Sequence, residues 1–259
     1  MIGAIAGDII GSIYEGAGTK SKEFPLFGPH NRFTDDTVLT VAVAESVLRG
    51  TDLVDTLHEY FHRYPAAGYG GSFIQWAWQR QREPYNSWGN GSAMRVSPVG
   101  FAFDTLEDVL HHAEQTAAVT HDHPEGIRGA QATAAAIFLA RTENDKRTIK
   151  SHVEESFGYD LSATLDEIRE TYAFDVSCQG SVPQSMVAFL EATDFEDTVR
   201  NAISLGGDAD TMACIAGGIA EAFWGIPAEI ERTTLKMLDD DLRAVVLEFR
   251  QRYQLLASN

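Results

Sequence analysis

The chain of 259 residues carries 38 Asp and Glu against 20 Lys and Arg, which gives a formal net charge of −18. Such acidity repels a nucleic-acid backbone unless a basic stripe offsets it, and the sequence shows none, so nucleic acid is disfavoured as a partner. A hydrophobic content of 44% suits a soluble globular protein. No apolar run approaches the ~20 residues of a membrane span, so we expect a cytoplasmic protein with no membrane partner.

The first segment, MIGAIAGDIIGSIYEG, is predicted to be a helix with unusual small-residue spacing. Gly3, Gly7 and Gly11 recur at steps of four, which places them on one face and lets a neighbouring backbone approach closely. The pattern is not the GxGxxG fingerprint of dinucleotide sites. Asp8 and Glu15 are seven residues apart, so we expect them to share a face of this helix, with Glu15 at its end.

Helical periodicity continues through the rest of the chain. Apolar residues at helical spacing predict further helices at 36–50, 51–64, 105–119, 123–141, 194–205 and 239–257. Convincing period-2 strands are absent from the sequence, and no low-complexity linker interrupts it. Cys178 and Cys214 lack metal-type spacing and are predicted to be buried thiols. We therefore predict an all-α fold in a single compact domain spanning residues 1–259.

Two predicted helix starts share one composition, although they lie far apart in the sequence. Each has two acids and a hydroxyl: Thr34, Asp35 and Asp36 in the first, and Asp208, Asp210 and Thr211 in the second. Helix capping explains one acid and one hydroxyl in each start. It leaves the second acid unexplained, because neighbouring carboxylates repel each other and raise each other's pKa.

A hard divalent cation would compensate that charge better than a helix N-terminus, which offers only about half a charge. Oxygen ligands without Cys or His suit Mg²⁺ or Mn²⁺ rather than Zn²⁺. If the two helix starts face each other, four carboxylates and two hydroxyls converge, and Glu15 adds a fifth carboxylate. This set is large enough for two metal ions with water positions to spare.

Five sequence pieces resemble, in order, the motifs of the ADP-ribosylglycohydrolase family. GAIAGDIIGSIYEG resembles its opening helix and glutamate, and FTDDT its first metal motif. WGNGSAMRVSPVG resembles its Gly/Asn loop, VTHDHPEGIRGA its Thr-His segment, and GGDADTMACIAGGIAEAFWG its second metal motif. Each piece alone is a modest signal, whereas five in order over nearly the whole chain are highly specific.

The resemblance implies an orthogonal all-α fold with a binuclear Mg²⁺ or Mn²⁺ centre that cleaves the bond at the anomeric carbon of ADP-ribose. It implies a catalytic set of Glu15, Asp35 and Asp210, in which Asp210 or Glu15 takes the proton of an activated water. Glu15 would be a further ligand or a gate. The implied metal ligands are Thr34, Asp35, Asp36, Asp208, Asp210 and Thr211.

The loop NSWGNGSAMR is predicted to bind the substrate. Gly89 and Gly91 allow backbone N–H groups to approach a phosphate, and the helix start that follows favours an anion. Trp88 is either a stacking residue for ribose or adenine, or a core aromatic. His121 is either a structural residue or, as the resemblance implies, faces the distal ribose or pyrophosphate. The predicted substrate-binding set is Ser87, Trp88, Gly89, Asn90, Gly91 and His121.

The leaving group is open between arginine, serine, acetate and a nucleic-acid base. The acidic chain favours a cationic guanidinium, so an ADP-ribosyl-arginine protein is the preferred substrate. The rim segments 16–32, 69–73 and 85–88 are the expected determinants of specificity. Two other functions compete with this one: a non-catalytic ADP-ribose binder, and a binuclear phosphohydrolase that acts on a nucleotide.

Overall fold

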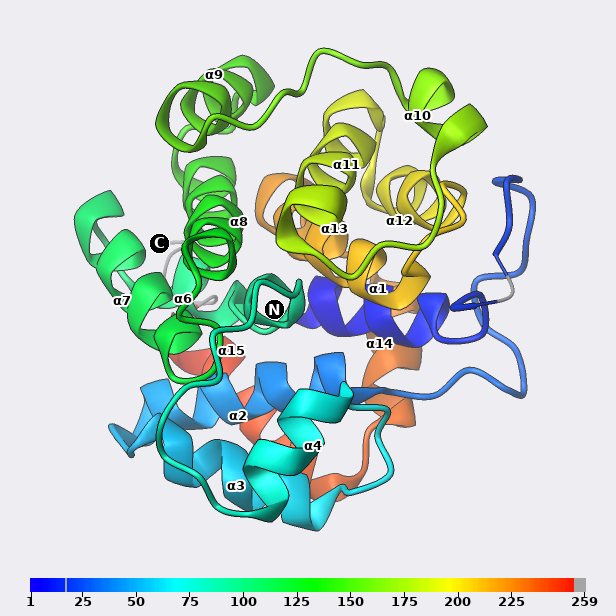
Figure 1. The fold of residues 1–259 in the computed structure, drawn as a ribbon. Helices are drawn as coiled ribbons and strands as arrows, with labels where there is room; N and C mark the ends of the chain where they lie inside the picture. The colour runs from blue at the N-terminus through cyan, green and yellow to red at the C-terminus, as the bar shows by residue number, and fades with distance from the viewer. Residues whose placement is uncertain (17, 254–259) are drawn as a thin grey trace.

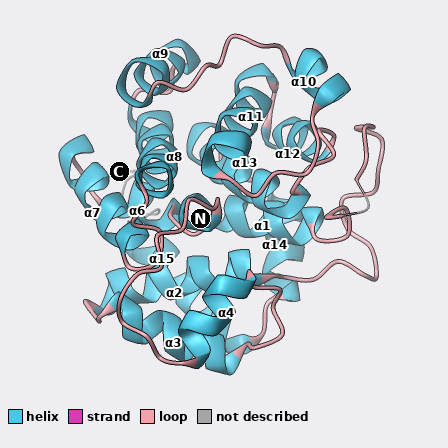
Figure 2. Cartoon of the chain, in the orientation of Figure 1, coloured by secondary structure: helices cyan, strands magenta, loops and turns pink. Residues whose placement is uncertain are grey.

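The computed structural model describes residues 1–16 and 18–253, and in this part of the chain the fold is all-α, as predicted (Figures 1 and 2). The only β-type contact among these residues is an isolated antiparallel bridge between Gly89 and Ser177. The helices are α1 (Ile2–Gly11), α2 (Asp35–Arg49), α3 (Leu53–Arg63), α4 (Gly71–Trp78), α5 (Gly91–Met94), α6 (Ser97–Ala102), α7 (Leu106–Ala118), α8 (Pro124–Thr142), α9 (Lys146–Phe157), α10 (Leu165–Thr171), α11 (Cys178–Glu191), α12 (Phe195–Ile203), α13 (Ala209–Trp224), α14 (Ala228–Met237) and α15 (Asp240–Tyr253).

Helices α1 and α13 form the centre of the molecule, and every residue of α1 is buried (Figure 1). The predicted glycine face of α1 lies against the backbone of α13. A Cβ added at Gly7 would lie 2.0 Å from the Ala213 carbonyl oxygen, and one added at Gly217 would lie 2.4 Å from the Gly3 carbonyl oxygen. The two backbones therefore touch at a distance that only glycine permits.

The other helices surround this central pair. In Figure 1, α2, α3 and α4 lie below α1, whereas α11 and α12 lie above it beside α13, and α7, α8 and α9 lie to one side. Helix α15 packs against α2. The predicted helix at 239–257 corresponds to α15, and its end beyond residue 253 lies outside the described residues.

The expectation that Asp8 and Glu15 share one helix face is wrong. Helix α1 ends at Gly11, and residues 12–16 form turns. Gly11 lies close to the α13 backbone, where an added Cβ would be 2.5 Å from Asp210 Cα. Asp8 is consequently fully buried, whereas Glu15 is exposed.

Both cysteines are free and buried, as predicted. Within the described residues, no helix is both long and apolar enough to cross a membrane.

Candidate metal centre and ligand pocket

The N-terminal ends of α2 and α13 meet at a cleft of about 480 Å³. Both acidic helix starts line this cleft, together with Glu15 and the loop that precedes α5. The structure therefore brings together two motifs that are more than 170 residues apart: Thr34, Asp35 and Asp36 with Asp208, Asp210 and Thr211.

The first helix start is organised from within the core by Asp8. Its carboxylate accepts hydrogen bonds from the Thr34 backbone N–H at 2.9 Å and the Thr34 hydroxyl at 2.6 Å. It also accepts from the Thr37 backbone N–H at 3.1 Å and from the Thr37 hydroxyl. Because the Thr34 hydroxyl proton is donated to Asp8, the Thr34 oxygen lone pairs are free to accept from Asp36 N–H and to face the cleft.

The second helix start is tied by hydrogen bonds to the first and to the segment NSWGNGSAMR, residues 86–95, which we call the ligand loop. The Thr211 hydroxyl donates to Asp36 Oδ1 at 3.4 Å, and the Asn90 side-chain amide donates to Asp208 Oδ2 at 2.7 Å. Gly206 precedes this motif with a φ of 69°, a left-handed conformation that glycine adopts without strain. Asp208 therefore enters the cleft from a sharp turn and not from the helix itself.

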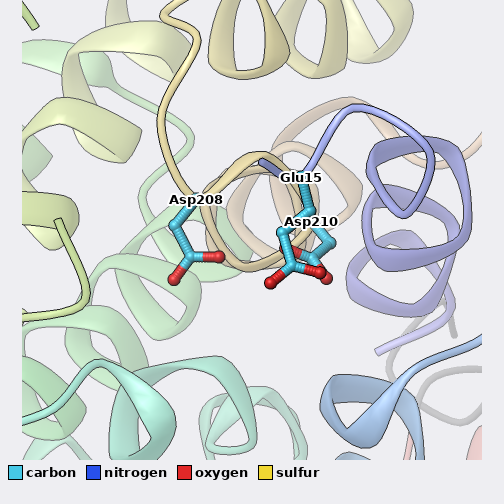
Figure 3. A group of neighbouring side chains, drawn as sticks. All are labelled: Glu15, Asp208 and Asp210. Carbon is cyan, nitrogen blue, oxygen red and sulfur yellow. The ribbon is translucent and has the colours of Figure 1, made fainter. Parts of the chain in front are cut away.

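Glu15, Asp208 and Asp210 place one carboxylate oxygen each within 4.8 Å of one another. Figure 3 shows the three carboxylates turned toward the same region beside the start of α13. Asp208 and Asp210 are buried, and Glu15 reaches them from the exposed turn after α1. This acidic cluster can hold a metal ion.

Burial raises the pKa of every acid in the cleft, and repulsion by neighbouring cleft acids raises it further for Glu15, Asp35, Asp36 and Asp210. Burial, and then the charge of Asp210, holds the pKa of Asp36 well above its usual range. Burial, followed by the charge of Asp8, raises the pKa of Asp35 to about 8. Partial burial and the charge of Asp208 raise the pKa of Glu15. Repulsion of this kind requires a nearby positive charge if the acids are to be ionised together.

The donor set fits a hard divalent cation. The buried Asp36 Oδ2 has no hydrogen-bond partner among the described residues, although an unpartnered buried carboxylate oxygen is costly. Carboxylate and hydroxyl oxygens are the ligands that Mg²⁺ and Mn²⁺ prefer. A cation in the cleft would satisfy the Asp36 oxygen and offset the repulsion at once.

We expect the metal-free protein to lose stability as the pH rises from about 4 to about 8. Asp35 has an ordinary pKa of 3.8 when unfolded and about 8 in the fold, so between these values the folded state binds the extra proton. Thermal unfolding in EDTA across this range should show a falling midpoint. Excess Mg²⁺ or Mn²⁺ should flatten the decline, because the ion binds the ionised acids; an unchanged slope would contradict a metal site here.

The ligand loop lies where the sequence predicted, but its backbone is used differently. The Gly89 N–H donates to Ser87 Oγ at 3.1 Å and the Asn90 N–H donates to the Val176 carbonyl at 2.8 Å. These two N–H groups are therefore engaged within the protein and are not free for a phosphate. Trp88 is 48% exposed and lines the cleft, so the alternative of a core aromatic is wrong.

His121 is buried and lines the cleft beside this loop. A Cβ added at Gly91 would lie 3.1 Å from His121 Nε2, and one added at Gly89 would lie 3.6 Å from it. The glycines of the loop thus leave room for the imidazole edge, which is a second reason for their presence. All members of the predicted substrate-binding set line the cleft: Ser87, Trp88, Gly89, Asn90, Gly91 and His121.

Several lining residues were not predicted from the sequence. Phe174 and Val176 come from the segment before α11, and Ala67 and Gly68 come from the segment between α3 and α4. Phe174 is 53% exposed at the cleft. The one sequence signal that marks this segment is a pair of apolar residues on either side of an acid, Phe174 and Val176 around Asp175. Of the expected rim segments, 85–88 lines the cleft throughout and 69–73 in part, whereas among the described residues of 16–32 only Arg32 lines it.

The all-α fold and the acidic cleft between two helix starts define a helical protein with a site suited to a divalent cation. The chain belongs to the ADP-ribosylglycohydrolase family, whose model matches residues 1–258. Membership of this family makes it a hydrolase of glycosidic bonds.

Individual relatives agree with this assignment. The chain is 27% identical to ADP-ribosylhydrolase ARH3 of Mus musculus, over 87% of this chain and 83% of the relative. It is 28% identical to ADP-ribosylarginine hydrolase Tri1 of Pseudomonas putida, over 58% of this chain and 42% of the relative. Among solved structures, an ADP-ribosylglycohydrolase-related protein complex matches with a TM-score of 0.72 and 26% identity, covering 97% of this chain and 96% of the other.

Proposed function

We propose that the chain is a metal-dependent hydrolase that cleaves the bond at the anomeric carbon of ADP-ribose and releases ADP-ribose from a modified target. The observation that carries this proposal is the cluster of Glu15, Asp208 and Asp210, whose carboxylate oxygens lie within 4.8 Å of one another in the cleft. The unpartnered oxygen of Asp36 beside them supports it. A cleft of about 480 Å³ lies in the usual range for a site that takes a small organic ligand.

Two Mg²⁺ or Mn²⁺ ions are the proposed cofactors. When bound, they would supply a water of lowered pKa and an anchor for the ribose hydroxyls. The proposed ligands are Thr34, Asp35, Asp36, Asp208, Asp210 and Thr211, with Glu15 as a further ligand or gate.

The side chains of the cleft have different proposed roles in the reaction. Asp210 or Glu15 takes the proton of the attacking water, and burial raises the pKa of each carboxyl, which makes it a stronger base than an exposed carboxylate. Asp35 and Asp36 would mainly hold the ions. The negative charge of the whole set stabilises a transition state with oxocarbenium character.

The ligand loop and His121 are the proposed contacts of the ADP-ribose moiety. Trp88, exposed at the cleft, offers a face for stacking on a ribose or an adenine. Asn90 links this loop to Asp208 through its side-chain amide. This hydrogen bond fixes the position of the substrate contacts relative to the acidic cluster.

The leaving group is proposed to be arginine. The support is electrostatic, since the carboxylates around the reacting carbon favour a cationic guanidinium. The relative whose printed name specifies arginine matches a shorter part of the chain than the relatives named only as ADP-ribosylhydrolases. Serine-, acetyl- and nucleic-acid-linked ADP-ribose are therefore the comparison substrates in any test.

A substrate panel with one chromatographic product assay tests the proposal. ADP-ribosyl-arginine, -serine and -DNA and O-acetyl-ADP-ribose are each incubated with Mg²⁺ and with Mn²⁺. We expect free ADP-ribose from at least one substrate, and fastest from the arginine-linked one. AMP or phosphate as the product would indicate the phosphohydrolase instead, and ADP-ribose binding without turnover of any substrate would indicate a non-catalytic binder.

A further inference from the structure

Arg95 is a buried cation that the proposed reaction does not use. Its side chain is fully buried, and its Nη2 donates to the Thr116 carbonyl and to the Thr120 hydroxyl, both at 2.8 Å. Its Nε and Nη1 have no hydrogen-bond partner among the described residues. Burying a guanidinium with so few partners is costly, so a role that offsets this cost is expected.

The Thr120 hydroxyl connects this cation to the cleft. Its Oγ1 lies 2.7 Å from His121 Nδ1. A hydroxyl has two lone pairs and one proton. Arg95 is a pure donor and occupies one lone pair, so the buried hydroxyl proton needs an acceptor, and His121 Nδ1 lies within hydrogen-bond distance to take that role.

The arrangement that suits both partners has Arg95 donating to Thr120 and Thr120 donating to His121 Nδ1. It gives the Thr120 proton an acceptor and makes Nδ1 an acceptor. The neutral imidazole must then carry its proton on Nε2, the nitrogen that faces Gly91 and the ligand loop. Burial, and then the charge of Arg95, holds the pKa of His121 well below its usual range, so the ring stays neutral.

We propose that Arg95 and Thr120 are positioning residues that hold His121 as the Nε2–H tautomer, so that it donates a hydrogen bond to an anionic group of the ligand in the cleft. The anionic group is the diphosphate of ADP-ribose, and to that extent the inference rests on the proposed function. The Gly89 and Asn90 N–H groups are engaged within the protein, and the imidazole N–H gives the cleft a buried donor for this anion. Neither Arg95 nor Thr120 needs to touch the ligand for this purpose.

The test combines the tautomer of His121 with the affinity for ADP-ribose in the full chain. Long-range proton–nitrogen spectra of ¹⁵N-histidine-labelled protein should show the His121 proton on Nε2. Thr120→Val removes the donor to Nδ1 and should weaken ADP-ribose binding about tenfold, as for loss of one hydrogen bond to a charged group. KM should rise by a similar factor, while kcat changes little. Thr120→Ser, which keeps the hydroxyl, should behave like the native chain.

A His121 proton on Nδ1 in the native chain would overturn the proposal, as would native affinity in a folded Thr120→Val variant. If Thr120→Val fails to fold, two measurements still test the proposal: the position of the His121 proton in the native chain, and the ADP-ribose affinity of the Thr120→Ser variant. The outcome is separable from that of the proposed function. ADP-ribose binding with the expected tautomer, but without cleavage of any substrate in the panel, would refute the hydrolase and leave the role of Arg95 and Thr120 standing.

Discussion

Asp210→Asn and Asp35→Ala should each lower kcat by about 1000-fold or more, with a much smaller effect on the fold. Each change removes a carboxylate from the acidic cleft and so weakens both ion binding and proton transfer. Loss of about 4 kcal/mol of transition-state stabilisation corresponds to a factor of this size. Initial rates of ADP-ribose release at saturating Mg²⁺ and Mn²⁺ measure the effect.

When no metal is present, the same substitutions should raise the thermal stability of the protein, although they lower its activity. The acids of the cleft repel each other in the fold, so removal of one of them relieves that repulsion. In EDTA, both variants should unfold at a higher temperature than the native chain. Glu170→Gln on the exposed face of α10 is the matched control, and it should change neither rate nor stability. Native activity in both cleft variants would contradict the metal centre.

Gly7→Ala should destabilise the fold by about 3 kcal/mol or more, although it adds a single methyl group. The added Cβ would lie 2.0 Å from the Ala213 carbonyl oxygen, which is backbone and cannot rotate away. Helices α1 and α13 would have to separate, and overpacking of this kind costs 1–3 kcal/mol or more. Denaturant unfolding of the variant and the native chain measures the difference.

Gly218→Ala is the control for this effect, because it lies on α13 beside the tightly packed Gly217. A Cβ at Gly218 would meet its nearest atoms, from Ile137 and Ser97, at 3.4 Å, an ordinary contact distance. Its stability should stay within about 1 kcal/mol of native, since alanine also favours the helix. Equal effects of Gly7→Ala and Gly218→Ala would show that helix propensity, and not the close approach of the two backbones, sets the stability.

Local rules predicted most of the features that build the cleft. Thr34 caps α2 as its position before an apolar run indicates. The four-residue spacing of glycines predicted a close helix contact, and the structure places α13 there. The repeated composition of two helix starts predicted that they meet, because both required the same charge compensation.

Features that depend on partners far apart in the chain were missed. Asp8 is a carboxylate in an apolar helix, and only the fold shows that it holds Thr34 and Thr37. The carbonyl of Val176 accepts from the N–H of Asn90, which lies between the two glycines that were expected to open the loop backbone to a phosphate. Helix α11 was not predicted, since it runs through Pro183, a residue that normally ends a helix. In each case tertiary contacts outweigh the local pattern.

The most direct test of the metal-dependent reaction follows a single enzyme sample through chelation and recovery. Release of free ADP-ribose from the best substrate of the panel is measured with Mg²⁺ present, again after EDTA, and again after excess Mg²⁺ is restored. We expect release to stop in EDTA and to return with the ion, while Asp210→Asn stays inactive throughout. Undiminished release in EDTA would contradict a metal-dependent reaction.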